Sequence, residues 1–249
     1  MSGHSKWANI RFRKERQDSV RGKVFTKLIK EITIAARNGG GDLDTNPRLR
    51  TAVQNAKAQN MPAKNIENAI LKGTGELPGV IYEEVNFEGY GPGGVALYII
   101  VTTDNRNRTV SEMRHLLSRY GGNLGESGSV SWVFEKKGLI RIRKESLSEE
   151  AMMMQAIDAG ADDFKVEDEF FEIYTPFDSL HKVRSALEQS SVTIENAELT
   201  MVPQNMVELE GKQAEQMLKL MEVLEDHDDV QNVFANFDID VKLMEKMQQ

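Results

Sequence analysis

The lysines and arginines of this sequence are grouped in a way that indicates a binding site, and the groups that such side chains bind are phosphates. The first 30 residues hold nine of them and only two acidic residues, Glu15 and Asp18. Clustered cations neutralise the phosphates of a nucleic acid, and the neighbouring rings of Trp7 and Phe12 offer a surface for stacking a base. Two simpler interpretations stay open: a solvated basic helix face, and a tryptophan that fills a core. The nucleic-acid contacts predicted in this segment are Lys6, Trp7, Arg11, Arg13, Lys14, Arg16, Arg21, Lys23, Lys27 and Lys30.

A second basic group, Arg48 and Arg50, follows the start of an expected helix. These two arginines either extend the basic surface or pair with Asp42 and Asp44, and the sequence leaves both interpretations open. We include them among the predicted nucleic-acid contacts.

A third basic group, Arg106 and Arg108, lies at an expected strand-to-helix turn. The unpaired amides of a helix start favour an anion, so the two arginines could bind a phosphate or a base there. The alternative is that the polar residues of the segment only shape the turn and that Thr109 caps the helix. Both interpretations can hold together.

No pattern typical of a catalytic or metal site is present. The sequence has no cysteine, no GxSxG, P-loop or HExxH motif, and its four histidines are isolated from one another. An enzyme would need residues that meet only in three dimensions, such as His115, Glu126 and Ser127. The acidic runs 162–172 and 222–229 lack the spacing of an EF-hand. We therefore predict no enzyme, no catalytic residue, no metal, no cofactor and no small-molecule substrate.

The charge is divided unevenly along the chain, although the formal net charge is −8. Residues 1–78 hold 15 lysines and arginines against 7 aspartates and glutamates, whereas residues 79–249 hold 16 against 32. A basic end attracts a polyanion while an acidic end is repelled by it, which favours one docking orientation. The predicted partner is a nucleic acid, either DNA or ribosomal and transfer RNA, with the ribosome as a further candidate.

The sequence also predicts a cytoplasmic protein without a membrane partner. Its longest apolar run, residues 95–101, is far shorter than the roughly 18 residues of a membrane-spanning helix. The first residues lack the apolar stretch of a signal peptide, and the absence of cysteine fits a reducing compartment.

Periodicity predicts three helices in the first 78 residues. Apolar residues recur at helical spacing over residues 24–36, and a run of three glycines ends that helix. Asn46-Pro47 provides a cap and a first-turn proline for a second helix, and a third follows Pro62 and ends at Gly73. Together they are expected to form one small bundle.

Beyond Pro78 the pattern is rich in strands. Strands are expected over residues 82–88, 95–103 and 130–135, and a helix over about residues 109–120. From Leu139 the order strand, helix, strand, strand, helix, strand is that of a ferredoxin-like unit. A last helix near residues 211–224 and a strand over 230–238 are expected to complete the sheet begun at Tyr82. The predicted fold class is α+β with three domains: a basic tail plus N-terminal three-helix bundle (1–78), a discontinuous α/β domain (79–136 and 204–249) and an inserted ferredoxin-like βαββαβ domain (137–203).

Six segments of the chain resemble those of the YebC family, whose mitochondrial relatives are translational activators of cytochrome c oxidase. The resemblance extends over the whole chain and implies the same three-domain architecture and non-catalytic action on nucleic acid. The segments are Gly3–Ile10, Arg21–Ile32, Asn46–Arg50, Glu88–Gly94, Thr103–Thr109 and Gly121–Gly125.

The resemblance implies two functions of different classes. Members of the family are described as DNA-binding transcriptional regulators, whereas others act in translation, at ribosomes slowed on difficult nascent sequences. The sequence shows no helix-turn-helix signature with a polar recognition helix, and its acidic remainder would resist lying along a duplex. These physical features favour RNA or the ribosome, while the resemblance favours transcription. In either case we expect the basic domain to dock on phosphates and the other domains to close on a second surface.

Overall fold

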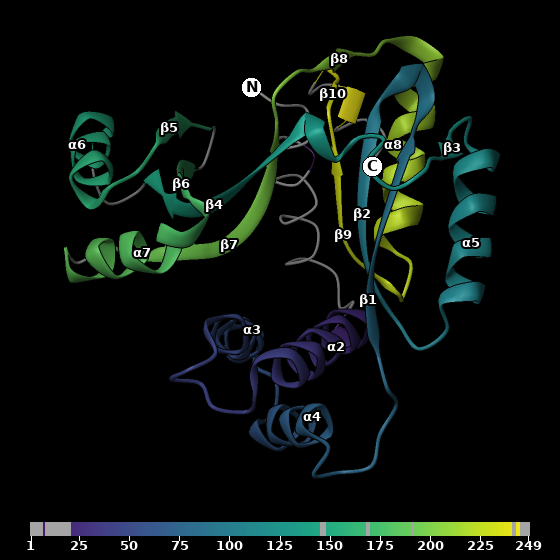
Figure 1. The fold of residues 1–249 in the computed structure, drawn as a ribbon. Helices are drawn as coiled ribbons and strands as arrows, with labels where there is room; N and C mark the ends of the chain where they lie inside the picture. The colour runs from purple at the N-terminus through teal and green to yellow at the C-terminus, as the bar shows by residue number, and fades with distance from the viewer. Residues whose placement is uncertain are drawn as a thin grey trace. The chain divides into compact units, whose positions relative to one another are not determined.

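The computed structural model describes residues 7, 21–144, 148–167, 170–190, 192–240 and 243–244 of the 249-residue chain. The chain divides into two compact units, Met1–Val133 with Asn205–Gln249, and Phe134–Gln204. These are unit 1 and unit 2, respectively (Figure 1). Since the sequence of unit 2 lies between two parts of unit 1, unit 2 is an insertion.

The N-terminal bundle of unit 1 consists of α2 (Arg21–Gly39), α3 (Pro47–Ala58) and α4 (Ala63–Thr74). As predicted, Asn46 caps α3: its side-chain oxygen accepts a hydrogen bond from the amide of Leu49 at 3.0 Å. Its amide nitrogen also donates to the carbonyls of Ala35 and Gly40, each at 2.8 Å, and this ties the end of α2 to the start of α3. The bundle has its own apolar core, which includes Ile32, Ala36, Leu49, Val53, Ile66 and Ala69.

An antiparallel sheet forms the centre of the rest of unit 1. Its strand order is β3 (Asn123–Leu124), β1 (Glu83–Tyr90), β2 (Ala96–Thr103) and β9 (Val230–Ala235). Two helices, α5 (Arg106–Arg119) and α8 (Gly211–Glu225), share a core with alternate side chains of β2, namely Leu97, Ile99 and Val101. A short parallel pair, β8 (Val207–Glu208) and β10 (Phe237–Asp238), also belongs to this unit. The prediction that a strand after the insertion completes the sheet begun near Tyr82 is confirmed.

The glycine-rich segment between β1 and β2 is a hairpin turn, as predicted. The two strands pair up to Tyr90 and Ala96, and the turn between them contains a short 3₁₀ helix, Pro92–Gly94. Gly93 and Gly94 have φ values of 70° and 80°, a region that side chains disfavour and glycine adopts readily. The turn therefore requires glycine at these two positions because their φ values are positive.

The predicted strand over residues 130–135 is wrong for residues 130–133. Ser131–Val133 is a 3₁₀ turn, and a single strand, β4, runs from Phe134 to Arg143. The reason is a buried carboxylate: Glu88 accepts hydrogen bonds from the amides of Val130 at 2.7 Å and Ser131 at 2.8 Å. Those amides are therefore used within the loop and do not enter a sheet ladder.

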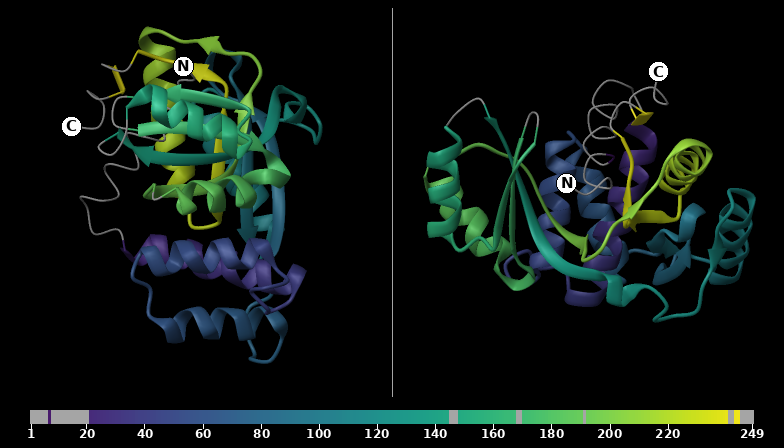
Figure 2. Two further views of the ribbon diagram at one scale, coloured as in Figure 1. Left: turned by 90° about the vertical axis from the view of Figure 1, so that its left-hand side faces the viewer. Right: turned by 90° about the horizontal axis from the view of Figure 1, so that it is seen from above.

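Unit 2 has the predicted βαββαβ order, and its fold is ferredoxin-like. The elements are β4 (Phe134–Arg143), α6 (Glu149–Ala159), β5 (Asp163–Val166), β6 (Phe170–Pro176), a 3₁₀ turn (Phe177–Ser179), α7 (Leu180–Gln189) and β7 (Ile194–Pro203). The antiparallel sheet has the order β5-β6-β4-β7, and α6 and α7 cover one of its faces (Figure 2). The core between them includes Ile140, Ile142, Met152, Phe171, Ile173 and Val183.

Candidate nucleic-acid interface

Part of the predicted basic surface lies outside the described residues, namely Lys6, Arg11, Arg13, Lys14, Arg16 and the side chain of Arg21. Trp7 is described and is only 2% exposed, in the core of unit 1. Its indole nitrogen donates a hydrogen bond to Glu225 Oε1 at 3.0 Å. The prediction that Trp7 offers a stacking surface is therefore wrong for this conformation, and its alternative, a tryptophan that fills a core, is what the structure has.

Lys23 and Lys27 contact the C-terminal end of α8. Lys23 Nζ donates to the carbonyl of Asp226 at 3.3 Å, and Lys27 Nζ donates to the carbonyl of Glu225 at 2.6 Å. The last carbonyls of a helix have no partner within the helix and form the negative end of its dipole, so nearby cations stabilise them. Because the two lysines are four residues apart, they lie on the same face of α2.

Lys30 continues the same face one turn further and is buried, with 7% of its surface exposed. Its Nζ lies 2.8 Å from Asp229 Oδ1, 2.9 Å from the carbonyl of Asp228 and 3.3 Å from the carbonyl of Thr102. We call Lys23, Lys27 and Lys30 the lysine stripe. In this conformation the Lys30 ammonium is enclosed by oxygens of the chain itself, so its predicted contact with phosphate would require release from them.

Asp229 is the anion at the centre of this contact. Its second oxygen, Oδ2, accepts hydrogen bonds from Arg108 Nη2 at 2.7 Å and from Thr109 Oγ1 at 2.8 Å. Burial alone would raise the pKa of the Asp229 carboxyl, but the hydrogen bonds from Lys30, Arg108 and Thr109 and the charge of Lys30 hold that pKa well below its ordinary value. Asp229 is therefore ionised at neutral pH and is the counter-ion of both Lys30 and Arg108.

The turn before α5 differs in detail from its prediction. The helix begins at Arg106, and Asn105 caps it by accepting a hydrogen bond from the amide of Arg108 at 3.1 Å. Thr109, the expected cap, is buried and donates to Asp229 instead. Arg108 is also bonded to Asp104 at 3.0 Å. Of the two arginines predicted to meet a partner here, only Arg106 is exposed without an ion-pair partner among the described residues.

The arginines of α3 are also engaged within unit 1. Arg48 forms salt bridges with Glu31, at 2.8 Å, and with Glu84, and these raise its pKa against the opposing effect of burial. Arg50 donates to the carbonyls of Leu43 at 2.8 Å and Asp44 at 2.7 Å. The carboxylates that pair with Arg48 are therefore glutamates of α2 and β1, and not Asp42 or Asp44, the partners predicted as its alternative.

Several cations that the sequence interpretation missed are exposed and have no hydrogen-bond or ion-pair partner in the described part of unit 1. They are Lys57 at the end of α3, Lys64 and Lys72 on α4, and Arg114 on α5. Each stands away from the apolar stripe of its helix, and that periodicity was the signal that could have identified them. The exposed positive charge of the described residues therefore lies partly outside the predicted set.

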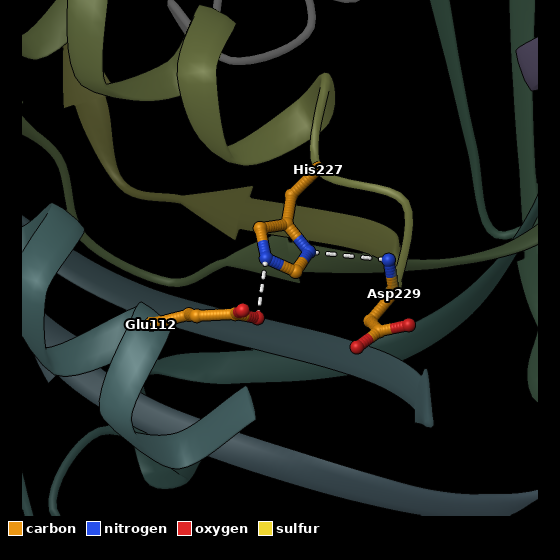
Figure 3. A group of neighbouring side chains, drawn as sticks. All are labelled: Glu112, His227 and Asp229. Atoms are coloured by element: carbon orange, nitrogen blue, oxygen red, sulfur yellow. Dashed lines mark hydrogen bonds and ion pairs between the residues drawn. The ribbon is translucent and has the colours of Figure 1, made fainter. Parts of the chain in front are cut away.

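Glu112, His227 and Asp229 lie close together, although the first two are 115 positions apart in the sequence (Figure 3). Both ring nitrogens of His227 are engaged: Nε2 lies 3.1 Å from Glu112 Oε2, and Nδ1 accepts a hydrogen bond from the amide of Asp229 at 3.1 Å. Since the Asp229 carboxylate is bonded to Lys30 and Arg108, the cluster lacks a set of free ligand atoms. We interpret it as a hydrogen-bond network that holds the turn between α8 and β9.

A hollow of about 400 Å³ lies beside the start of α8. Four carboxylates line it, those of Glu208, Glu210, Asp238 and Asp240. Like charge repels a phosphate, so this hollow does not suit a nucleic acid. Among the described residues, no helix combines the length and the apolar character needed to cross a lipid bilayer.

The fold and this site define an α+β protein with a basic helical bundle, a discontinuous sheet and an inserted ferredoxin-like unit. Residues 5–76 match the TACO1/YebC protein N-terminal domain, and residues 82–237 match the TACO1/YebC second and third domain. The chain belongs to the TACO1/YebC family.

Relatives of high identity cover the whole chain. A probable transcriptional regulatory protein of Syntrophobacter fumaroxidans is 57% identical over 248 residues, which are 99% of this chain and 100% of that protein. One from Geobacter sulfurreducens is 58% identical over 247 residues, with the same coverage. A crystal structure of a conserved hypothetical protein, Aq1575 from Aquifex aeolicus, has a TM-score of 0.84 and 50% identity, and the match covers 90% of this chain and 92% of that one.

Proposed function

We propose that the chain is a non-enzymatic regulator of gene expression that binds nucleic acid through its basic N-terminal part. The observation that carries the proposal is the division of charge, with 15 basic against 7 acidic residues in residues 1–78 and the reverse beyond them. The relatives are named probable transcriptional regulatory proteins, which supports the same class of function. Action in the cytoplasm belongs to this proposal, because the nucleic acids concerned are there.

The relatives' names favour a role in transcription, for which the nucleic acid would be DNA, and the side chains of α3 support the alternative, RNA or the ribosome. Arg48 and Arg50 are held within unit 1, which leaves Gln54 and Lys57 as the exposed long polar side chains of this helix. Reading base edges in a major groove requires several long polar side chains on an exposed recognition helix. Contact with phosphates through scattered cations has no such requirement. The alternative function is therefore a translational activator that binds ribosomal or transfer RNA and relieves stalling at difficult nascent sequences.

The lysine stripe gives this proposal a mechanism. Its three ammonium groups donate to carbonyl oxygens and to the carboxylate of Asp229. The oxygens of a phosphate backbone accept hydrogen bonds in the same way and carry a full negative charge. The bundle and the sheet of unit 1 have separate apolar cores, and this contact between them is polar. Polar interfaces between separately packed cores release more easily than apolar ones. We propose that a polyanion competes with the end of α8 for the stripe.

The salt dependence of nucleic-acid binding tests whether the lysine stripe is the binding site. A short single-stranded RNA and a short DNA duplex are titrated with the full chain at increasing salt, with wild type and the double variant Lys23→Gln/Lys27→Gln. If both lysines contact phosphate, the slope of log K against log salt for the single strand falls by about 1.4 in the variant. The matched control, Lys212→Gln/Lys219→Gln on α8, removes the same charge from exposed positions outside the bundle and leaves the slope unchanged. Equal slopes for all three proteins would refute the assignment.

Fluorescence energy transfer between two labels tests separately whether a polyanion displaces the end of α8 from the lysine stripe. Because the chain has no cysteine, Lys64→Cys on α4 and Glu222→Cys on α8 introduce a single pair of labelling sites at exposed positions. The distance between the labels should rise when RNA is added. Binding without a change in distance would refute the release of the stripe and leave the function standing, whereas the absence of binding to either nucleic acid would refute the function.

Ribosome co-sedimentation and crosslinking to RNA or DNA in cells separate the two functions. Recovery of one promoter sequence without ribosome association would establish transcription as the role. Recovery of ribosomal or transfer RNA with the ribosomal fraction would establish translation.

A further inference from the structure

Helix α6 of unit 2 is apolar on two sides. Met152 and Ala156 are fully buried in the core beneath it. On the outward side Met153 is 41% exposed, Met154 65% and Ile157 60%. A surface helix usually has one apolar stripe towards its core and a polar face towards water. Packing in the core of unit 2 therefore does not account for the apolar residues on the outward side of α6.

The three exposed residues form one continuous surface, which we call the methionine face. Met153 and Ile157 are four residues apart and Met154 and Ile157 are three apart, so all three lie on neighbouring positions of one helix face. Single exposed apolar residues are common, but contiguous patches on the order of a few hundred Å² mark interaction sites. Methionine is flexible and polarizable, and it is frequent on surfaces that accept partner helices.

The surroundings of the methionine face are acidic. Glu149 and Glu150 lie at its N-terminal end and Asp158 at its C-terminal end, all exposed, and α6 has no basic residue. Residues 134–204 as a whole hold 15 acidic against 8 basic residues. A nucleic acid would be repelled here. A second copy of the same face would place its carboxylates against these, which opposes self-association.

We propose that the methionine face of α6 docks a cationic amphipathic helix of a protein partner. The apolar stripe of such a helix covers Met153, Met154 and Ile157, and its lysines or arginines meet the three carboxylates at the rim. An apolar centre with a charged rim is the usual arrangement of an interface, where the centre supplies the affinity and the rim the selectivity. This surface is independent of the lysine stripe in unit 1.

The test uses the full chain and a fluorescent synthetic amphipathic peptide of leucine and lysine. Wild type should bind it and should not bind the matching peptide of leucine and glutamate. The double variant Met154→Gln/Ile157→Gln keeps every charge and should weaken binding at least about tenfold, because the apolar centre carries the affinity. Glu150→Gln/Asp158→Asn should weaken binding mainly at low salt.

The matched control is Leu199→Gln, which removes a 45% exposed apolar side chain elsewhere in unit 2 and should leave binding unchanged. Equal binding by wild type and Met154→Gln/Ile157→Gln would overturn the proposal, since attraction would then come from net charge alone. Sedimentation at increasing concentration gives a second measurement: an association of wild type with itself that Met154→Gln/Ile157→Gln abolishes would replace the cationic partner with a second copy.

Discussion

Lys30 and Asp229, 199 positions apart in the sequence, form a buried salt bridge with 2.8 Å between Nζ and Oδ1. The lysine comes from the middle of α2 and the aspartate from the residue before β9. A buried charge is tolerated only when it is paired and hydrogen-bonded, and both groups satisfy this condition. The pair therefore joins the N-terminal bundle to the C-terminal part of unit 1.

Loss of the lysine should destabilise unit 1 strongly. In Lys30→Met the Asp229 carboxylate stays buried with fewer partners, and removal of one member of a buried pair costs about 3 kcal/mol. Urea unfolding measures the change in the free energy of unfolding. In a Trp132→Phe background Trp7 is the remaining tryptophan and reports on the core of unit 1.

An exposed position provides the control for this variant. Lys57→Met on α3 should change the free energy of unfolding by less than about 0.5 kcal/mol, as is usual for surface substitutions. Similar losses in Lys30→Met and Lys57→Met would show that the buried pair has no special role in stability.

The same pair predicts a dependence on pH. The pKa of Asp229 in the folded chain lies below its unfolded value of about 3.9, so its ionised form stabilises the fold at neutral pH. This contribution is fully present above about pH 4 and is lost as the pH falls towards the folded pKa. The difference in free energy of unfolding between wild type and Asp229→Asn should therefore be largest at pH 7 and shrink below about pH 4. A difference that stays constant down to pH 2 would contradict this assignment.

Much of the fold could be predicted because apolar spacing and turn residues are local properties of the sequence. Asn46 and the glycines after β1 act on neighbouring residues, so their effects could be predicted from sequence alone. The orientation of the lysine stripe could not, because most of its partners come from the end of α8 and the turn after it, about two hundred positions away. A basic helix face has the same pattern whether it meets a phosphate, water or the carbonyl end of another helix.

Glu88 also binds residues that are distant in the sequence. Its carboxylate accepts hydrogen bonds from the amides of Gly128, Val130 and Ser131 at 2.7–2.8 Å. Burial would raise the pKa of Glu88, but these hydrogen bonds lower it. In Glu88→Gln an NH2 group replaces one carboxylate oxygen, and this group cannot accept a hydrogen bond from a backbone amide. We therefore expect the free energy of unfolding to fall by about 2 kcal/mol.

Hydrogen exchange measures the consequence of that substitution in the loop. The amides of Gly128, Val130 and Ser131 should exchange faster in Glu88→Gln than in wild type. Glu83→Gln, at an exposed position of the same strand, should leave their exchange unchanged. Unchanged protection in Glu88→Gln would mean that other contacts hold the 3₁₀ turn at Ser131–Val133.

The contact between α2 and α4 depends on a glycine. A Cβ on Gly73 would lie 2.5 Å from the carbonyl oxygen of Thr33 and 2.7 Å from Ala36 Cβ, so Gly73→Ala must push the two helices apart. Overpacking of this kind costs about 1–3 kcal/mol. Gly22→Ala is the matched control, since nothing lies within 4 Å of its Cβ, and alanine should raise stability there by up to about 1 kcal/mol through helix propensity. Urea midpoints for the two variants should therefore move in opposite directions. A rise for Gly73→Ala would mean that α4 packs less closely against α2 than these distances require.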